Sequence, residues 1–380
     1  MHSQKISLYS ILFFTILFSL FLTTKVFAVA PTVTTGTATP AETSATASGT
    51  LNSTGGIPTT SIGFEYGLTT GYGASVSDTY LHDFSYSYDS QFGSSGTGNG
   101  QFDGPSYIAF DSSENIYVAD SVNDRIQKFD SSGTYVTQWG SSGSGDGQFN
   151  NPKGITIDSL DNVYVLEGSN NRIQKFTSAG VFITKWGTLG SGDGQFLFPA
   201  AGLSIDSADN IYAVDAFNHR IQKFTSAGVF ITKWGTNGTG DGQFNTPAGI
   251  AIDSSGNVYV SDSFNNRIQK FTSAGVYITQ WGSSGSGDGE FSTTVGIAVD
   301  SSDNIYVTDR TNNRIQKFTS AGVYITQWGS SGSGDGEFST PVGIAVDSSD
   351  NIYVADANDR IQKFTRSFSL SLSSLVCNTL

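Results

Sequence analysis

The sequence contains few of the residues on which disulfides, metal sites and polyanion contacts depend. Of 380 residues, Cys377 is the only cysteine and three are histidines. A single cysteine excludes an internal disulfide, so packing must supply the stability. Lys and Arg number 19 against 33 Asp and Glu, which gives a net charge of −14. Because this acidic balance repels nucleic-acid phosphates and anionic lipids, we expect no nucleic-acid partner.

Long apolar runs are also scarce, and the one that stands out is N-terminal. Residues 11–22 (ILFFTILFSLFL) follow Lys5 and are shorter than the roughly 20 apolar residues that span a membrane. Val26 and Ala28 supply the small residues for signal-peptide cleavage after Ala28, and Ala28 and Ala30 supply them for cleavage after Ala30. We expect residues 1–28 to be a signal peptide, and the mature chain to be secreted or held at the cell envelope or surface without membrane insertion. An uncleaved anchor is the alternative.

The rest of the chain is dominated by a repeat of about 47 residues. Each unit has four short stretches rich in β-branched and aromatic residues, separated by Gly, Asn, Asp and Ser turns, which predicts a meander of four antiparallel strands. Apolar residues fall on both faces of a strand, as Ile268 and Phe271 do, which is expected for sheets covered on both sides. Six units begin at Gly100, Gly147, Gly194, Gly242, Gly289 and Gly336.

The repeated pattern GIAIDSSGNVYVSDSFNNRIQKF (residues 249–271) resembles the NHL repeat. The resemblance covers residues 100–364 and implies an all-β, six-bladed β-propeller of four-stranded antiparallel blades. The last unit has only three such strands, whereas FSYSYDSQFG (residues 84–93) resembles the fourth-strand segment, with Phe92 in the place of its Trp. We expect this N-terminal strand to complete the last blade; residues 367–373 are the alternative.

The segments that flank the repeats differ in composition. Residues 29–80 are rich in Thr, Ser, Ala and Gly and resemble the first half of a fibronectin type III-like module of bacterial surface proteins. About three strands cannot form the usual sandwich of about seven, which leaves a remnant, a stalk or a sheet completed by a partner. We expect a signal peptide at 1–28, this partial module at 29–80, the propeller at 81–365 and a tail of unassigned role at 366–380.

Every unit places an acidic residue five positions before a repeated Arg, or four in the last unit. A hairpin brings such residues together, and a guanidinium can bind a carboxylate and turn carbonyls at once. We therefore interpret these as structural pairs rather than anion sites; they are Asp120–Arg125, Glu167–Arg172, Asp215–Arg220, Asp262–Arg267, Asp309–Arg314 and Asp356–Arg360. The five tryptophans each end a fourth strand, which favours a wedge between blades over a sugar-binding ring.

No catalytic constellation is evident. Among enzymes whose propellers resemble this fold, peptidyl-hydroxyglycine amidating lyases use histidine-bound zinc and streptogramin lyases use paired histidines. Here only His82 and His219 remain after the signal peptide, too few for three imidazole ligands. The GSGDG loops have one Asp each, too few for calcium. We expect no metal site and no cofactor, with room only for a weakly bound ion in the central channel. The RNA-binding branch of the family uses a basic face, which this chain lacks.

Differences between the units concentrate in two places: the stretch leading into the first strand, and the turn between the second and third strands. In a meander both emerge on one face, and loops on a rigid scaffold often carry recognition. Drift of surface loops is the alternative interpretation. We expect a monomeric binding or scaffold protein that recognises a protein or glycan with this face; the alternatives are a hydrolase or lyase with a channel-bound metal ion and a structural protein of the cell wall. The distinctive side chains there are Lys153, Phe198, Phe217, His219, Phe264 and Arg310.

Overall fold

The computed structural model describes residues 46–48, 63–66, 74–77, 84–199 and 202–371. The expected signal peptide, His82 and Cys377 lie outside these residues. Contacts divide the chain into two units, Ser85–Ser367 and Met1–Phe84 with Phe368–Leu380. All regular structure described is β-strand apart from two short 3-10 turns, η1 (Ala216–Asn218) and η2 (Ser263–Asn265).

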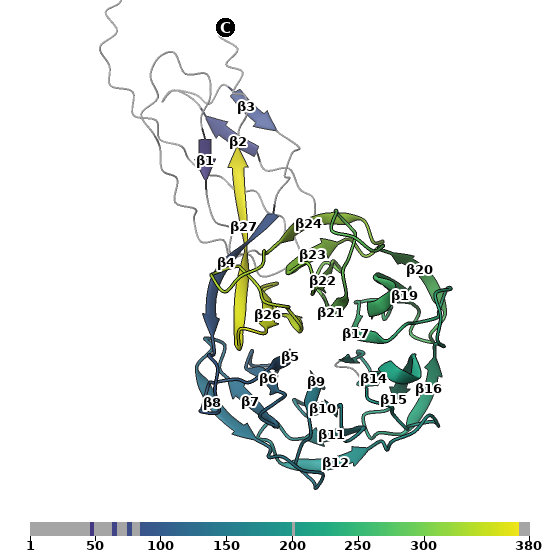
Figure 1. Cartoon of the computed structure of the whole chain (residues 1–380). Coiled ribbons are helices and arrows are strands. Elements are labelled where there is room, and N and C mark those ends of the chain that lie inside the picture. Colours follow the sequence, from purple (N-terminus) through teal and green to yellow (C-terminus); the bar gives the residue numbers. More distant parts are fainter. Residues whose placement is uncertain (1–45, 49–62, 67–73, 78–83, 200–201, 372–380) are drawn as a thin grey trace, which may run out of the picture. The chain divides into compact units, whose positions relative to one another are not determined.

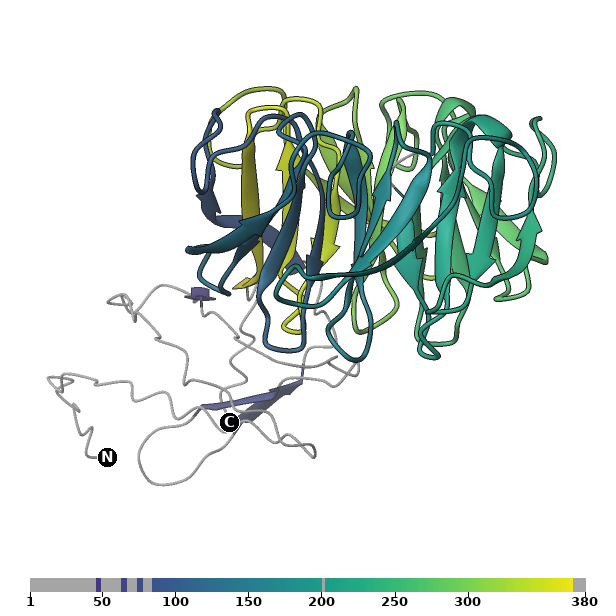
Figure 2. The same cartoon turned by 90° about the horizontal axis from the view of Figure 1, so that it is seen from below.

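The unit Ser85–Ser367 is a ring of six four-stranded antiparallel blades (Figures 1 and 2), as the repeat predicted. The first strand of each blade lies nearest the ring centre and the fourth lies outermost (Figure 1). Blade 1 comprises β5 (Pro105–Phe110), β6 (Ile116–Asp120), β7 (Arg125–Phe129) and β8 (Tyr135–Trp139); blade 2 comprises β9 (Pro152–Ile157), β10 (Val163–Glu167), β11 (Arg172–Phe176) and β12 (Phe182–Trp186); blade 3 comprises β13 (Leu203–Ile205), β14 (Ile211–Asp215), β15 (Arg220–Phe224) and β16 (Phe230–Trp234).

The other three blades follow the same order. Blade 4 comprises β17 (Pro247–Ile252), β18 (Val258–Asp262), β19 (Arg267–Phe271) and β20 (Tyr277–Trp281); blade 5 comprises β21 (Thr294–Val299), β22 (Ile305–Asp309), β23 (Arg314–Phe318) and β24 (Tyr324–Trp328); blade 6 comprises β25 (Ile344–Val346), β26 (Ile352–Asp356), β27 (Arg360–Ser371) and β4 (Phe84–Phe92).

The strand β4 closes the ring, because it pairs with β27 as the fourth strand of blade 6. This confirms the expected closure. Phe92 takes the place of the repeated Trp, with its ring centroid 4.8 Å from that of Phe129 in blade 1. Residues 367–371, the alternative fourth strand, instead continue β27. Of the N-terminal segment, β1 (Thr46–Ser48) pairs with Ser369–Ser371, and β2 (Gly63–Tyr66) pairs with β3 (Ala74–Ser77).

A polar cluster accompanies the closure between blades 5 and 6. The Tyr86 and Tyr306 hydroxyls lie 2.6 Å apart, and the Arg366 guanidinium donates to Asp300 Oδ2 at 3.1 Å. The Lys317 ammonium lies 5.0 Å from the Tyr306 ring centroid and 3.4 Å from Asp300 Oδ2. Burial, together with the positive charge of Arg366, lowers the pKa of Lys317 to about 8, although the Asp300 carboxylate opposes this shift.

Burial of the strands explains their composition. The second strands are buried at every residue, because neighbouring blades cover both of their faces, and they contain the sequences IYVAD, VYVLE, IYAVD, VYVSD and IYVTD. The outer strands of blades 1 to 5 instead alternate half-buried and exposed residues, as β20 does. The gradient follows from the ring geometry, since only the inner strands are enclosed on both faces.

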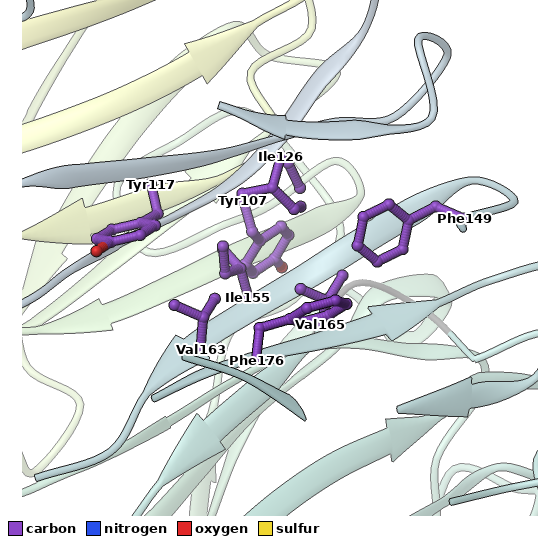
Figure 3. Close-up of a cluster of buried hydrophobic side chains, with 9 residues drawn as sticks. Tyr107, Tyr117, Ile126, Phe149, Ile155, Val163, Val165 and Phe176 are labelled. Carbon is purple, nitrogen blue, oxygen red and sulfur yellow. The ribbon is translucent and has the colours of Figure 1, made fainter. Parts of the chain in front are cut away.

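A hydrophobic cluster lies between each pair of neighbouring blades. Between blades 1 and 2, Tyr117 and Ile126 pack with Val163, Val165 and Phe176 (Figure 3). The third strands contribute to two clusters each, because alternate faces meet different neighbours. The core is therefore six inter-blade layers rather than one centre.

The third strand of blade 4 shows how one strand serves two layers. Ile268 packs against blade 5, and Phe271 packs against blade 3. The expectation that these two side chains point to opposite neighbours is confirmed.

The tryptophans are part of this inter-blade packing, as expected. The Trp139 ring centroid lies 5.9 Å from that of Phe176 in the next blade. A Cβ added at Gly180, which has φ +80°, would lie 2.6 Å from Trp139 Cδ2. The turn between the third and fourth strands thus needs glycine for two reasons, its backbone conformation and the indole against it.

The turns between first and second strands fasten neighbouring blades on the face opposite the variable loops. The backbone N–H and the hydroxyl of Ser254 donate to the Asp303 carboxylate at 2.9 and 2.7 Å. The same double contact joins Ser112 to Asp161, Ser159 to Asp209 and Ser301 to Asp350. We call this double hydrogen bond from Ser to Asp the clasp. In blade 4, Gly256 stands where blades 2, 3, 5 and 6 have the accepting Asp, so blades 3 and 4 lack the clasp.

Candidate functional site

The variable face is the surface made by the loops that lead into the first strands and by the turns between second and third strands. Backbone hydrogen bonds join the two within a blade. Phe217 N–H donates to Leu197 O at 3.3 Å, and Phe264 N–H donates to Asn245 O at 3.2 Å. In blade 5, Arg310 N–H donates to Thr293 O at 3.1 Å. The structure therefore places the two most variable segments of each repeat side by side.

The Arg–carboxylate pairs hold this face from beneath. Arg267 Nε donates to Asp262 Oδ2 at 2.8 Å, and the other guanidinium nitrogens donate to the carbonyls of Thr239, Gly240 and Gln243 in the preceding inter-blade loop. Direct Nε–carboxylate pairs also join Arg125 to Asp120, Arg172 to Glu167, Arg220 to Asp215, Arg314 to Asp309 and Arg360 to Asp356. The guanidinium groups are thus buried in the framework.

The same carboxylates also bind the variable loops. Asp262 Oδ1 accepts the Asn245 N–H at 2.7 Å, and its Oδ2 accepts the Asn265 side-chain amide at 2.9 Å. One buried acid therefore orders the leading loop, the turn and the Arg of its blade. In blade 6 the turn is one residue shorter, and the Arg360–Asp356 distance rises to 3.4 Å.

His219 occupies the last position of its turn, where the other blades have Asp or Asn. This residue has φ +53°, in the left-handed region in which Asn, Asp and His are enriched. Its Nδ1 accepts the Thr246 N–H of the next blade at 3.1 Å, whereas in blade 4 the Asn266 side-chain oxygen accepts the Thr293 N–H at 2.8 Å. His219 therefore links blades 3 and 4, and it does so as an acceptor that carries its proton on Nε2.

The three phenylalanines of the expected site are exposed. Phe198, Phe217 and Phe264 have 54%, 56% and 62% of their surface accessible. The Phe198 and Phe217 rings, both on blade 3, meet edge to face with their centroids 6.0 Å apart. Exposed aromatic rings of this kind are typical of recognition surfaces rather than of framework positions.

Lys153 and Arg310 belong to blades 2 and 5, which lie on opposite sides of the ring (Figure 1). Lys153 is on the innermost strand β9, and a Cβ added at Gly168 would lie 3.3 Å from its Cε. Its stem thus runs along the backbone of the blade 2 turn. Burial, and next the positive charge of Arg310, lower the pKa of Lys153. The two cations therefore act on each other across the ring centre.

Tyr107 is a residue of this region that the sequence analysis missed. It stands where the first strands of the other five blades have glycine, and it is 4% exposed. Its hydroxyl donates to Val295 O of blade 5 at 3.3 Å. Val342 of blade 6 packs against the same cluster. The side chain thus crosses the ring centre, and the signal for it was the single departure from glycine.

Other chemistry is limited in the part of the chain that the structure describes. No group of three or more His, Cys, Asp or Glu residues there is arranged to hold a metal ion. Nor does any described helix have the length and apolar character needed to cross a bilayer. The variable face, with its exposed rings and central cations, is therefore the candidate site.

Comparisons with known proteins agree with the fold. Residues 149–176 and 244–271 match the NHL repeat family, and residues 301–373 match a family described as a 6-bladed beta-propeller. The chain therefore contains NHL repeats in a six-bladed propeller, as its sequence pattern predicted. No match to a curated protein was found.

Solved structures resemble the chain in fold. Virginiamycin B lyase from Staphylococcus aureus is 19% identical, covers 74% of this chain and 99% of its own, and has a TM-score of 0.51. A gluconolactonase from Xanthomonas campestris is 14% identical, covers 70% and 88%, and has a TM-score of 0.54. A Bacteroides thetaiotaomicron protein of unknown function is 17% identical, covers 82% and 83%, and has a TM-score of 0.58. At these identities the likeness concerns the propeller fold alone.

Proposed function

We propose that this protein is an extracellular or cell-surface binding module that captures a protein or glycan partner with the variable face of its propeller. The observation that carries the proposal is the exposure of Phe198, Phe217 and Phe264 on neighbouring blades of one face. Phe198 lies in a leading loop, and Phe217 and Phe264 lie in turns. These segments are held by buried ion pairs and inter-blade hydrogen bonds, so binding would require little ordering of the loops.

The position of the rings also separates them from other exposed apolar residues. Ile231 and Ile278 are each 44% exposed on the outer strands β16 and β20, at the same place in their repeats. An apolar residue that recurs at the same outer-strand position in different blades is expected from the repeat itself and does not indicate a binding surface. Phe217 and Phe264 instead occupy turns whose residues change from blade to blade, which is expected of a surface that has diverged for recognition.

A matched pair of double variants tests the proposal. The full chain would be used to select binders from a random peptide display library and from a glycan array. Phe217→Ser with Phe264→Ser should abolish capture of the selected ligands, because the apolar contact area is lost. Ile231→Ser with Ile278→Ser removes apolar residues from the same two blades and should leave capture unchanged. Equal capture by both double variants would refute the proposal.

The folded state of each variant can be checked independently. All four side chains are substantially exposed, so neither double variant should shift the thermal midpoint by more than a few degrees. Export is a separate part of the proposal, and intact-mass measurement of protein from the culture medium or envelope tests it. A mature chain that begins after Ala28 or Ala30 is the expected result.

A further inference from the structure

The central cations of the variable face differ from almost every other cation of the propeller. Between Tyr86 and Arg366, all lysines and arginines but Lys153, Arg310 and Lys363 form an ion pair with a carboxylate. Lys363 lies over the Tyr353 ring at 5.4 Å. Lys153 and Arg310 are thus the two cations of this region with neither kind of partner, in a chain whose net charge is −14.

Their surroundings favour an external anion. The positive charge of Arg310 is near enough to Lys153 to contribute to its lowered pKa, and the backbone that carries each cation is held in place. Lys153 follows Pro152 on the inner strand β9, and Arg310 begins a turn bonded to Thr293. An anion placed between them would offset the repulsion and give each cation an ion-pair partner. The planar guanidinium of Arg310 can donate two parallel hydrogen bonds, which suits a carboxylate in particular.

The acidic residues of the face lie elsewhere. In the loops and turns that form the variable face, Asp103, Asp124 and Asp359 belong to blades 1 and 6, and the Asp124 and Asp359 carboxylates accept the N–H groups of Asn151 and Gly104. The variable stretches and turns of blades 2 to 5 (150–153, 168–171, 197–201, 216–219, 245–248, 263–266, 292–295 and 310–313) contain no Asp or Glu. The exposed Asp146, Asp193, Asp241 and Asp288 lie earlier in the inter-blade loops. Lys153 of blade 2 and Arg310 of blade 5 thus flank the two blades that carry the exposed phenylalanines.

We propose that Lys153 and Arg310 form an anion site at the centre of the variable face, which binds a carboxylate of an acidic peptide segment whose apolar side chains pack on Phe198, Phe217 and Phe264. This inference rests on the proposed function and names its ligand class. A peptide suits the site because it can present a carboxylate beside apolar side chains, which the phenylalanine rings can bury. The described tryptophans, whose indole could serve a sugar, are packed between blades.

Tyr107 fills space at the ring centre near Lys153 and Arg310. Its side chain crosses the ring centre from blade 1 to Val295 of blade 5. A ligand carboxylate would therefore be held at the mouth rather than drawn into the ring. Removal of Lys153 and Arg310 should accordingly change binding and leave the core intact.

The test uses peptides selected from a random display library on the full chain, with fluorescence anisotropy as the measurement. The selected peptides should contain Asp or Glu beside apolar residues. Replacing their acids by amides should weaken binding at least about tenfold, and Lys153→Met with Arg310→Gln should weaken it by a similar factor. Raising the salt concentration should weaken binding to the wild type more than to this double variant.

A charge-matched variant serves as the control. Lys185→Met with Lys233→Met removes two cations from outer strands, where they pair with Asp146 and Asp193. This control should retain full affinity, which separates a local site from a general effect of net charge. A loss of affinity as large as that of Lys153→Met with Arg310→Gln would overturn the proposal.

The remaining outcomes separate this inference from the proposed function. If the selected peptides lack acids, or bind Lys153→Met with Arg310→Gln unchanged, the anion site is refuted while a phenylalanine-based binding face stands. If oligogalacturonate binds the wild type and no acidic peptide does, the peptide class is wrong. If no probe binds and no acidic peptide is selected, the anion site is refuted as well.

Discussion

Removing one guanidinium from the framework tests how the variable face is held. The substitution Arg267→Met keeps an unbranched side chain of similar length but deletes the charge and its donors. Arg267 is 7% exposed and Asp262 is fully buried. The guanidinium donates five hydrogen bonds: to Asp262 Oδ2, to the Gln280 side chain, and to the carbonyls of Thr239, Gly240 and Gln243.

The expected loss in the free energy of unfolding follows from the buried Asp262 carboxylate that remains without its cation. Asp262 keeps its hydrogen bonds from Asn245 N–H and from the side chains of Asn265 and Gln269, but its charge loses its only ion-pair partner among the described residues. Breaking a buried pair from one side typically destabilises by about 3–5 kcal/mol. We therefore expect Arg267→Met to lower the free energy of unfolding by about 3–5 kcal/mol.

The exposed ion pair Lys185–Asp146 serves as a control, because its N–O distance is similar to that of Arg267–Asp262. Lys185 Nζ and Asp146 Oδ1 lie 2.7 Å apart, but their side chains are 41% and 57% exposed. Exposed pairs contribute about 0–1 kcal/mol, so Lys185→Met should have a small effect. Urea unfolding followed by circular dichroism and by tryptophan fluorescence gives both values, provided that the two transitions coincide.

A double variant separates the pair from its surroundings. Asp262→Asn with Arg267→Met removes both charges, so the destabilisation should be smaller than the sum of the two single effects by about 1–3 kcal/mol. If Arg267→Met is no more harmful than Lys185→Met, or if the two substitutions at the buried pair add fully, the view that this pair organises the blade is refuted.

Three further substitutions test other contacts. Gly256→Asp should restore the clasp to Ser207 that four other blade interfaces have, and should raise the free energy of unfolding by about 0.5–1 kcal/mol in urea titrations, whereas Gly256→Ala should not. The pKa of Lys317 is about 8 in the folded protein, below its ordinary 10.5, so its contribution to stability is present above pH 10.5 and is lost as the pH falls through 8. The stability of the wild type should therefore rise between pH 8 and 10 by about 1–3 kcal/mol relative to Lys317→Met, and parallel pH profiles would contradict this. Tyr107→Phe should lose about 0.5–1.5 kcal/mol with the bond to Val295, and Tyr107→Ala about 3–5 kcal/mol with the filled ring centre; an Ala variant as stable as the Phe variant would exclude a packing role.

Much of the fold could be predicted from the sequence because each blade is specified locally. The strands, turns and glycines of one unit recur at a fixed spacing, so all six repeats predict the same local structure. The closure by β4 was also predictable, since Phe92 stands where the other fourth strands have Trp. His219 shows the limit of such comparison: because it replaces Asn or Asp, it was expected among the binding residues, whereas its Nδ1 accepts the Thr246 N–H as an Asn oxygen would.

The amino-acid sequence by itself determined the blades, their number and the face on which the units differ, because these depend on contacts within a unit or between adjacent ones. The approach of Lys153 in blade 2 to Arg310 in blade 5 depends on closure, which brings together residues far apart in the chain. Only the tertiary structure could therefore place Lys153 opposite Arg310 and Tyr107 against Val295. A local pattern carries no information about which blades will face each other until the ring has closed.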